Sequence, residues 1–376
     1  MGLRIRALVV AALVAVSQAS PVVLPRDDST PNITYAFTNP NGLNFTQMNT
    51  TLPNVTIFAT GGTIAGSAAD NTATTGYQAG ALGIQTLIDA VPEMLDVANV
   101  AGVQVANVGS GDISSTILLE IAHRLNTIVC TDPTISGAVV THGTDTLEET
   151  AFFLDATVNC RKPIIIVGAM RPATAISADG PYNLLESVTL AANPEARDRG
   201  ALVVLNDRIA SAYYVSKTNA NSLDTFKALE AGYLGAIVSN TPYFYYPPLQ
   251  PTGKTAIDVG NVTAIPRVDI LYSYQDMTND TLFAAVENGA QGVVIAGTGA
   301  GSSSSSYSSA ISELTEAEFP VVRSTRTGSG EVPFSDSGSI SSGFLNPPKA
   351  RILLGLFLAK GKKFEEIREV FGKVAV

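Results

Sequence analysis

Short runs of β-branched and aliphatic residues alternate with longer segments of helical periodicity from residue 54 onward. This alternation is typical of an α/β fold built on a parallel sheet. Before residue 240 we predict strands at residues 55–59, 103–108, 138–141, 164–167 and 202–205. Helical patterns lie between them. One is opened by Asp112 as an N-cap and keeps its apolar residues on one face as far as Leu125, and another covers residues 145–153.

The alternation stops between residues 240 and 267, where five prolines crowd a segment with few helix or strand signals. We interpret residues 242–266 as a linker. A second α/β block follows, with strands near residues 268–272, 293–296 and 321–323 and helices near residues 281, 311 and the C-terminus. We interpret the serine run 302–306 as a loop after a strand.

These patterns predict a two-domain α/β protein. Residues 53–241 form a larger N-terminal catalytic domain with a parallel-rich sheet and flanking helices, and residues 267–376 form a smaller C-terminal α/β domain. A length of 376 residues with 45% apolar residues suits two hydrophobic cores. The net charge of −10 has the wrong sign for holding a phosphate backbone, so we expect no nucleic acid partner.

The first 20 residues have the composition of an export signal peptide. Arg4 and Arg6 precede an apolar run at residues 7–16, and Ser17 and Ala19 have cleavage-like spacing. A membrane anchor is the alternative, but the run of ten residues is about half of the ~20 that a spanning helix needs. We therefore predict a secreted protein, extracellular or in a cell-wall or periplasmic space, with no membrane partner.

Export would make six Asn-x-Thr sequons usable as glycosylation sites. They are Asn32, Asn44, Asn49, Asn54, Asn261 and Asn279. Four of them fall within 23 positions of a polar stretch without hydrophobic periodicity, so we interpret residues 21–52 as a solvated N-terminal tail. Export also favours a disulfide between the two cysteines, Cys130 and Cys160, over the alternative of two buried free thiols.

Three polar turns that contain glycine directly follow predicted strands, at residues 60–66, 109–112 and 141–146. In an open parallel sheet, ligands bind at the carboxyl ends of the strands. Each turn alone has a simpler structural explanation, because glycine permits a tight turn and Asp112 or Asp145 can cap a helix. Two threonine-bearing glycine turns after separate strands of one sheet favour a functional site.

The residue inventory disfavours several familiar kinds of active site. The chain has only His123 and His142 and no Gly-x-Ser-x-Gly turn, which argues against a Ser-His-Asp hydrolase. We interpret His123, within an amphipathic helical pattern, as structural. The chain also lacks the zinc motifs, the phosphate-binding loop lysine and the dinucleotide fingerprint. We therefore expect hydroxyl chemistry without histidine, metal or cofactor.

Several segments carry a family resemblance, at residues 52–54, 60–66, 141–150, 167–172, 177–181 and 345–347. In this order they resemble the type II, secreted L-asparaginases of the asparaginase/glutaminase family. The resemblance implies an amidohydrolase that converts L-asparagine to L-aspartate and ammonia. It also implies the two-domain architecture, a disulfide between Cys130 and Cys160, and a homotetramer built as a dimer of dimers with shared active sites.

By this resemblance, Thr63 matches the family's nucleophilic threonine, and Tyr77 matches a tyrosine on a mobile loop that hydrogen-bonds it. Thr144, Asp145 and Lys217 match a second polar triad beneath the substrate. In that triad the lysine helps to polarise the threonine hydroxyl. Backbone N–H groups near Thr144 are candidates for stabilising an oxyanion.

Ser110 and Asp145 match residues that hold the substrate's α-carboxylate and α-ammonium groups, and Glu331 matches a glutamate contributed across a subunit interface. Two positions depart from the family's pattern: Gly111 replaces a polar side chain, and Ala300 replaces an asparagine. Both departures bear on affinity and selectivity for the amino-acid end of the substrate. The alternative function is an amino-acid-binding or relic glycoprotein with little turnover, and the retained site residues favour the enzyme.

Overall fold

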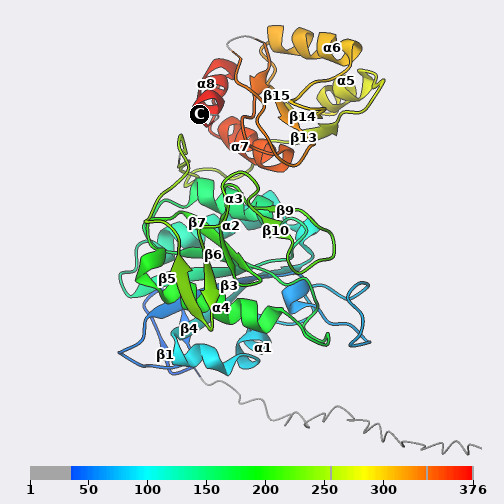
Figure 1. The fold of residues 1–376 in the computed structure, drawn as a ribbon. Helices are drawn as coiled ribbons and strands as arrows, with labels where there is room; N and C mark the ends of the chain where they lie inside the picture. Colours follow the sequence, from blue (N-terminus) through cyan, green and yellow to red (C-terminus); the bar gives the residue numbers. More distant parts are fainter. Residues whose placement is uncertain (1–34, 255, 336–337, 375–376) are drawn as a thin grey trace, which may run out of the picture. The chain divides into compact units, whose positions relative to one another are not determined.

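The computed structural model describes residues 35–254, 256–335 and 338–374 (Figure 1). It contains a ten-stranded sheet, a two-stranded ribbon and a four-stranded sheet. The predicted fold class, a larger N-terminal and a smaller C-terminal α/β part, is confirmed. The predicted signal peptide, residues 1–20, and the sequon at Asn32 lie outside the described residues.

The large sheet is parallel at its centre and antiparallel towards both edges. Its strand order is β1-β2-β4-β3-β5-β6-β7-β8-β11-β12, and the pairs from β4 to β7 in this order are parallel. The strands are β1 (Phe37–Thr38), β2 (Asn44–Phe45), β3 (Asn54–Gly61), β4 (Asn99–Val108), β5 (Ile135–Thr141), β6 (Ile164–Val167), β7 (Ala201–Leu205), β8 (Arg208–Ser211), β11 (Gly235–Val238) and β12 (Thr241–Phe244). The ribbon pairs β9 (Ser216–Lys217) with β10 (Phe226–Lys227).

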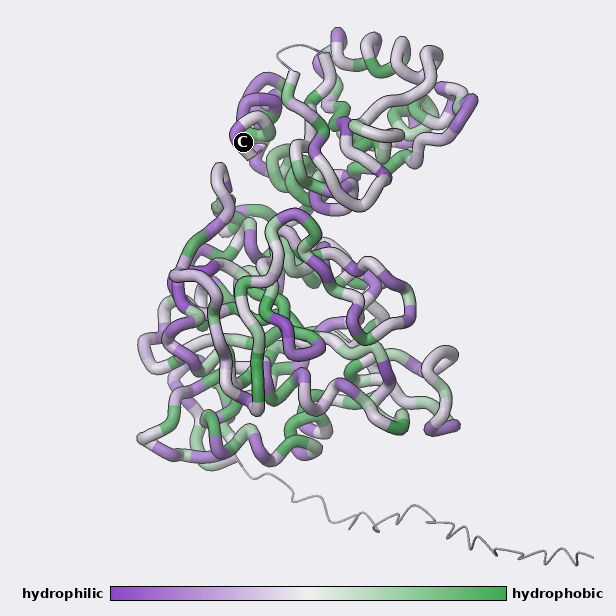
Figure 2. The backbone as a smooth tube through the Cα atoms, in the orientation of Figure 1, coloured by the Kyte–Doolittle hydropathy of each residue, from purple (hydrophilic) through white to green (hydrophobic). Residues whose placement is uncertain are grey.

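Helices cover both faces of this sheet. They are α1 (Ile84–Asp89), α2 (Ser115–Arg124), α3 (Leu147–Thr157) and α4 (Gly180–Ala192). Residues of α2 and α3 share a hydrophobic cluster with Phe58 of β3, whereas residues of α1 and α4 share another with its neighbour Ile57. Because successive strand residues point to opposite faces, strands buried on both sides read as continuous apolar runs. Figure 2 shows hydrophobic residues along most of the central strands.

The four-stranded sheet is parallel throughout, in the order β13-β14-β15-β16. Its strands are β13 (Val268–Tyr272), β14 (Gly292–Gly297), β15 (Val321–Thr325) and β16 (Ile340–Ser341), and its helices are α5 (Asp280–Glu287), α6 (Ser305–Glu316), α7 (Pro347–Ala359) and α8 (Phe364–Val374). The serine run 302–306 is only partly the predicted loop, because α6 already begins at Ser305. The Ser304 hydroxyl caps it by accepting a hydrogen bond from Tyr307 N at 3.4 Å.

The predicted solvated tail is wrong for residues 37–45. This segment forms β1 and β2 at one edge of the large sheet. Leu43 and Phe45 are buried, and the rings of Phe37 and Phe45 stack with their centroids 4.8 Å apart. Strands of two residues are too short to leave a hydrophobic period in the sequence, so the pattern could not reveal them.

Two predicted boundaries also differ from the structure. The strand β12 extends beyond residue 241 into the predicted linker, because Pro242 lies on an edge strand, where a missing N–H is tolerated. Asp112 does not cap α2, since residues 110–112 form a 3₁₀ turn. Ser114 is the cap, and its hydroxyl accepts a hydrogen bond from Ile117 N at 3.3 Å.

Cys130 and Cys160 are joined by a disulfide in the structure, with a sequence separation of 30. It ties the end of the helical segment 125–129 to the turn before β6. Within the described ranges, no helix is both long enough and apolar enough to cross a membrane.

Candidate active site

Close backbone packing brings the three glycine turns together. A Cβ atom on Gly62 would lie 2.2 Å from the backbone nitrogen of Gly143, and one on Gly143 would lie 2.9 Å from the Cβ of Ser110. Only glycine fits at such distances, and Gly62 also has a left-handed φ of +77°. The turns after β3, β4 and β5 therefore meet at the carboxyl edge of the parallel strands, where ligands of such sheets bind.

Thr63 and Tyr77 form the first hydroxyl pair of the site. The Thr63 Oγ1 and Tyr77 Oη atoms are 2.7 Å apart, and either can donate the hydrogen bond. Thr63 is buried in the turn after β3. Tyr77 comes from a largely exposed loop that an antiparallel bridge between Ser67 and Gln78 closes.

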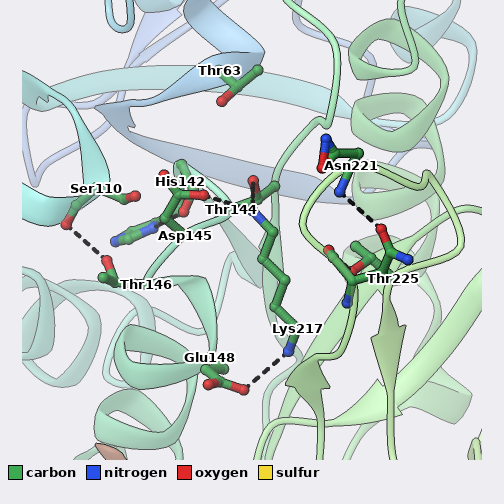
Figure 3. Close-up of polar contacts among 12 residues, drawn as sticks. Thr63, Ser110, His142, Thr144, Asp145, Thr146, Glu148, Lys217, Asn221 and Thr225 are labelled. Carbon is green, nitrogen blue, oxygen red and sulfur yellow. Dashed lines mark hydrogen bonds and ion pairs between the residues drawn. The ribbon is translucent and has the colours of Figure 1, made fainter. Parts of the chain in front are cut away.

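Thr144, Asp145 and Lys217 form a second polar group (Figure 3). The Lys217 Nζ atom donates to Thr144 Oγ1 at 3.1 Å and to Asp145 Oδ1 at 2.6 Å. The Lys217 side chain is 14% exposed and the Asp145 side chain is 83% exposed. The ammonium group is therefore shielded from water, while the carboxylate keeps an open side. A cation that donates to a hydroxyl oxygen favours loss of the hydroxyl proton.

Ser110 lies at the same edge of the sheet, beside Gly143. It is buried, and its carbonyl oxygen accepts a hydrogen bond from Thr146 Oγ1 at 2.7 Å, which ties the second turn to the third. The neighbouring Gly111 is exposed, and apart from Gly111 and its two chain neighbours no atom of the described chain lies within 4 Å of the place where its Cβ would be. No other described side chain of the same molecule fills the gap that this glycine leaves.

His142 was not assigned to the site, yet it fixes the Thr144 turn. Its Nδ1 is 2.8 Å from the carbonyl oxygen of Gly143, and its Nε2 is 2.8 Å from Thr150 Oγ1. Because a carbonyl can only accept, the neutral ring carries its proton on Nδ1 and Thr150 donates to Nε2. Burial lowers the pKa of His142 to about 4. The ring is therefore uncharged near neutral pH, and both of its nitrogens are occupied.

Asp179 was also missed, and it orders the loop beside Tyr77. Its carboxylate accepts hydrogen bonds from the backbone nitrogens of Met170 and Arg171, both at 2.9 Å. Ile176 lies in the loop that Asp179 orders, and Asn71 lies in the loop that carries Tyr77. The Ile176 backbone nitrogen donates to the Asn71 carbonyl oxygen at 2.8 Å, which joins the two loops. Asp179 lies in the segment 177–181 that carries the family resemblance, but the resemblance assigned it no role, and its hydrogen bonds to Met170 and Arg171 reveal one.

Glu331 is not brought together with the other predicted site residues. It is exposed on the segment after β15, and its side chain makes no hydrogen bond or ion pair with any residue that the structure describes. Next to it, Gly330 N donates to Glu230 Oε1 at 2.8 Å. Ala300 is exposed in the turn after β14.

The site offers two hydroxyls, one paired with a phenol and one with an ammonium group, beside a carboxylate that is open to solvent. A hydroxyl activated by hydrogen-bonded partners can attack a carbonyl carbon, and an open carboxylate can bind a cationic group. Across the described residues, no group of three or more His, Cys, Asp or Glu side chains is placed to hold a metal ion.

Comparisons with known proteins match both parts of the chain. Residues 54–250 match the family model "Asparaginase, N-terminal", and residues 267–371 match the glutaminase/asparaginase C-terminal domain. The chain is 50% identical to probable L-asparaginase 1 of Schizosaccharomyces pombe, over 87% of this chain and 91% of that protein. It is 42% identical to L-asparaginase 2 of Escherichia coli, over 86% and 93%. Among solved structures, that of a probable cytoplasmic L-asparaginase from Campylobacter jejuni matches with a TM-score of 0.81 and 44% identity, covering 85% of this chain and 99% of that one.

The predicted secreted location is wrong by this comparison. The solved structure that matches over 85% of the chain is that of a probable cytoplasmic enzyme, so resemblance to secreted members does not carry a compartment. The prediction rested on the composition of residues 1–20, which does not depend on the fold. Glycosylation of the sequons was predicted on the condition of export, so that prediction is withdrawn together with the secreted location. In the structure, Asn54 Oδ1 already accepts a hydrogen bond from Asn99 Nδ2 at 2.8 Å.

Proposed function

The chain belongs to the asparaginase/glutaminase family and is an amidohydrolase that hydrolyses L-asparagine; from this premise we propose that Thr63 is its nucleophile. The position of Thr63 carries the proposal, because its hydroxyl lies where the glycine turns meet, 2.7 Å from the Tyr77 phenol. Both ring nitrogens of His142, the histidine next to these turns, are occupied by other partners. Tyr77 is therefore the group in position to exchange a proton with Thr63.

In the first step, Thr63 Oγ1 attacks the side-chain amide carbon of asparagine. A C–O bond forms, the carbonyl oxygen takes up negative charge, and the hydroxyl proton passes through the hydrogen-bonded partner towards the leaving nitrogen. Collapse of the tetrahedral intermediate breaks the C–N bond and releases ammonia, which leaves an ester on Thr63. Water then hydrolyses the ester, releases L-aspartate and restores the threonine.

Lys217 holds and polarises Thr144 during these steps. Its ammonium group donates to Thr144 Oγ1 at 3.1 Å, which makes the Thr144 hydroxyl a better donor to a reacting atom. Backbone N–H groups near Thr144 are the candidates for binding the oxyanion. Loss of one such donor typically costs ~2.7 to 4 kcal/mol of transition-state stabilisation.

Ser110 and Asp145 hold the amino-acid end of the substrate in this proposal. Asp145 is 83% exposed, so its carboxylate can accept from an α-ammonium group, and the Ser110 hydroxyl can donate to an α-carboxylate. Glu331 is exposed and has no partner among the described residues of its own chain, which supports a role in the site of a neighbouring subunit. We accordingly propose a homotetramer, a dimer of dimers.

Ammonia release by Thr63→Ala and Thr63→Ser tests the nucleophile. Thr63→Ala should be inactive and folded, because it removes a hydroxyl without adding volume. Thr63→Ser keeps the hydroxyl and should keep measurable turnover, which makes it the matched control. A near-normal rate in Thr63→Ala would reject the assignment. Running L-asparagine beside D-asparagine and L-glutamine in the same assay defines the selectivity.

A further inference from the structure

A buried cation lies in the first turn of α7, outside the site described above. Lys349 is the third residue of this helix and is 2% exposed, and the other buried residues of α7 are apolar or glycine. Burying an ammonium group is costly unless its partners compensate. A cation in the first turn also lies at the positive end of the helix dipole, which is unfavourable. Its hydrogen-bond partners must therefore compensate for the cost of placing Lys349 there.

Those partners belong to the segment that leads into Lys217. The Lys349 Nζ atom donates to the carbonyl oxygens of Tyr213 at 2.7 Å and Val215 at 2.6 Å. The N-cap of the same helix, Asn346, donates from Nδ2 to Ser216 Oγ at 3.0 Å. The first turn of α7 thus binds residues 213, 215 and 216, immediately before the lysine that contacts Thr144.

Glu148 holds Lys217 from α3, close to the Thr144 turn. Its Oε2 accepts a hydrogen bond from the backbone nitrogen of Lys217 at 3.1 Å. Burial raises the pKa of Glu148, and the charge of Lys349 opposes that rise. In return, burial lowers the pKa of Lys349 to about 8, while Glu148 and Asp155 act to raise it. The two charges therefore compensate each other across the chain segment that they hold.

We propose that Lys349 is a positioning residue for the hydrolysis: it fixes the backbone of residues 213–217 so that the Lys217 ammonium stays in contact with Thr144. In this proposal Lys349 acts through the backbone carbonyls of Tyr213 and Val215, to which it donates, and not on the substrate itself. The proposal rests on the role given to Lys217 under the proposed function. A misplacement of about 1 Å in a catalytic group can cost up to about 100-fold in rate. A residue that anchors this segment from a distance can therefore change the rate of hydrolysis.

Steady-state kinetics of Lys349→Met against Arg351→Gln test this role. Arg351 lies on the same helix and its Nη2 is 3.0 Å from Glu149 Oε2, so it joins α7 to α3 and makes no hydrogen bond to residues 213–217. We expect Lys349→Met to lower kcat roughly 10- to 100-fold with KM changed less than about threefold. Arg351→Gln should keep kcat within about twofold. Equal losses in the two variants, or a normal kcat in folded Lys349→Met, would overturn the proposal.

A double-mutant cycle with Lys217→Met separates this inference from the proposed function. If Lys349 acts through Lys217, adding Lys349→Met to Lys217→Met should lower kcat by less than about twofold further. A full additional loss would overturn the positioning role and leave the role of Lys217 intact. A normal kcat in Lys217→Met alone would instead remove the role of Lys217, and this inference with it.

Ser216→Ala decides the matter if Lys349→Met does not fold. Ser216 is partly buried, and its hydroxyl links Asn346 to Glu148. Its loss removes one of the anchors of the segment without leaving a charge unpaired. We expect an unchanged melting temperature and a kcat lowered roughly three- to tenfold. A kcat within about 1.5-fold of the wild type in a folded Ser216→Ala protein would contradict the proposal.

Discussion

The site has two hydroxyl pairs, Thr63 with Tyr77 and Thr144 with Lys217. Their threonines occupy similar positions in the fold, but their partners are held in place differently. Thr63 and Thr144 each follow a glycine just after neighbouring parallel strands, β3 and β5, which are paired in register from Val55 to Ala59. Tyr77 reaches Thr63 from a largely exposed loop. Lys217 reaches Thr144 from a ribbon whose entry is fixed by the buried Lys349 and the partly buried Glu148, on two different helices.

This difference assigns different duties to the two pairs. An exposed loop can open to admit a substrate and close over it, whereas a buried charged group cannot leave its partner without a large penalty. We therefore interpret the Thr63 pair as the movable half of the site and the Thr144 pair as its fixed half. Removing a buried charged group that supports the fixed half should affect stability as well as rate, and perturbing the movable half should affect rate alone.

Loss of the Thr144 hydroxyl should have the largest effect. Thr144→Val keeps the shape of the side chain and removes the oxygen to which Lys217 donates at 3.1 Å. We expect kcat to fall roughly 10²- to 10³-fold or more, comparable with Thr63→Ala. The measurement is ammonia release at saturating L-asparagine. If the valine variant keeps a tenth of the wild-type rate, the fixed half serves only as structure.

Acidification should weaken the fixed half through His142. Its folded pKa of about 4 lies below the ordinary value of 6.5. The stability that it contributes is therefore complete above pH 6.5 and is lost as the pH falls towards 4. Between pH 7 and pH 5, His142 should lower the free energy of unfolding by about 2 kcal/mol.

Urea unfolding of wild type and His142→Gln at both pH values checks this expectation. Burial raises the pKa of Glu186 to about 8, so this carboxyl contributes stability below its ordinary pKa that is lost as the pH rises through 8. Between pH 7 and pH 5, Glu186 therefore raises the free energy of unfolding as the pH falls, whereas His142 lowers it. Glu186 is present in both the wild type and His142→Gln, so its contribution cancels in the comparison. The difference between the two proteins isolates His142. An identical pH dependence would show that its protonation costs the fold nothing.

Local rules in the sequence extend to the three glycine turns of the proposed site. A strand pattern followed by a glycine turn predicted where Thr63, Ser110 and Thr144 lie, since parallel strands end at one edge. Local sequence patterns do not predict the residues that hold the Thr144 and Lys217 pair in place. Lys349 stands 132 positions after Lys217, and Glu148 looks in the sequence like an ordinary first-turn acid.

The family resemblance supplied Tyr77, Lys217 and Glu331, which no periodicity indicates. The resemblance did not determine the cellular location, because the location of a protein and the geometry of its active site are separate properties. The same limit explains the missed edge strands at residues 37–45. Two-residue strands gain their stability from the sheet that they join, and they leave almost no pattern of their own.

Loss of the Tyr77 hydroxyl should cost less than loss of either threonine hydroxyl. Tyr77→Phe removes one hydrogen bond to Thr63, at 2.7 Å, and keeps the aromatic ring in the loop. A positioned group that transfers the proton of a nucleophile typically contributes about 10²- to 10⁴-fold, so kcat should fall roughly 100-fold, the low end of that range. Thermal stability should stay unchanged, because the loop is exposed. A lower melting temperature would show that this half is as rigid as the other.

Gly111→Gln should have the smallest effect and should sharpen the comparison without touching either hydroxyl pair. The φ of Gly111 is outside the left-handed range, and no described atom beyond its two chain neighbours lies within 4 Å of its Cβ position, so glutamine fits without strain. A hydrogen bond to a charged group of the substrate contributes about 1.5 to 3 kcal/mol, whereas ordering an exposed glutamine costs up to about 2 kcal/mol.

The net gain of about 1 kcal/mol should lower the KM for L-asparagine roughly fivefold and leave kcat nearly unchanged. L-Glutamine is one methylene longer and depends more on anchoring of its amino-acid end to bring its amide to Thr63, so its KM should fall further. Gly109→Gln, in the same turn, is the matched control for a general effect of added bulk. If Gly111→Gln raises the KM for both substrates, a side chain of a neighbouring subunit already occupies the space beside Gly111.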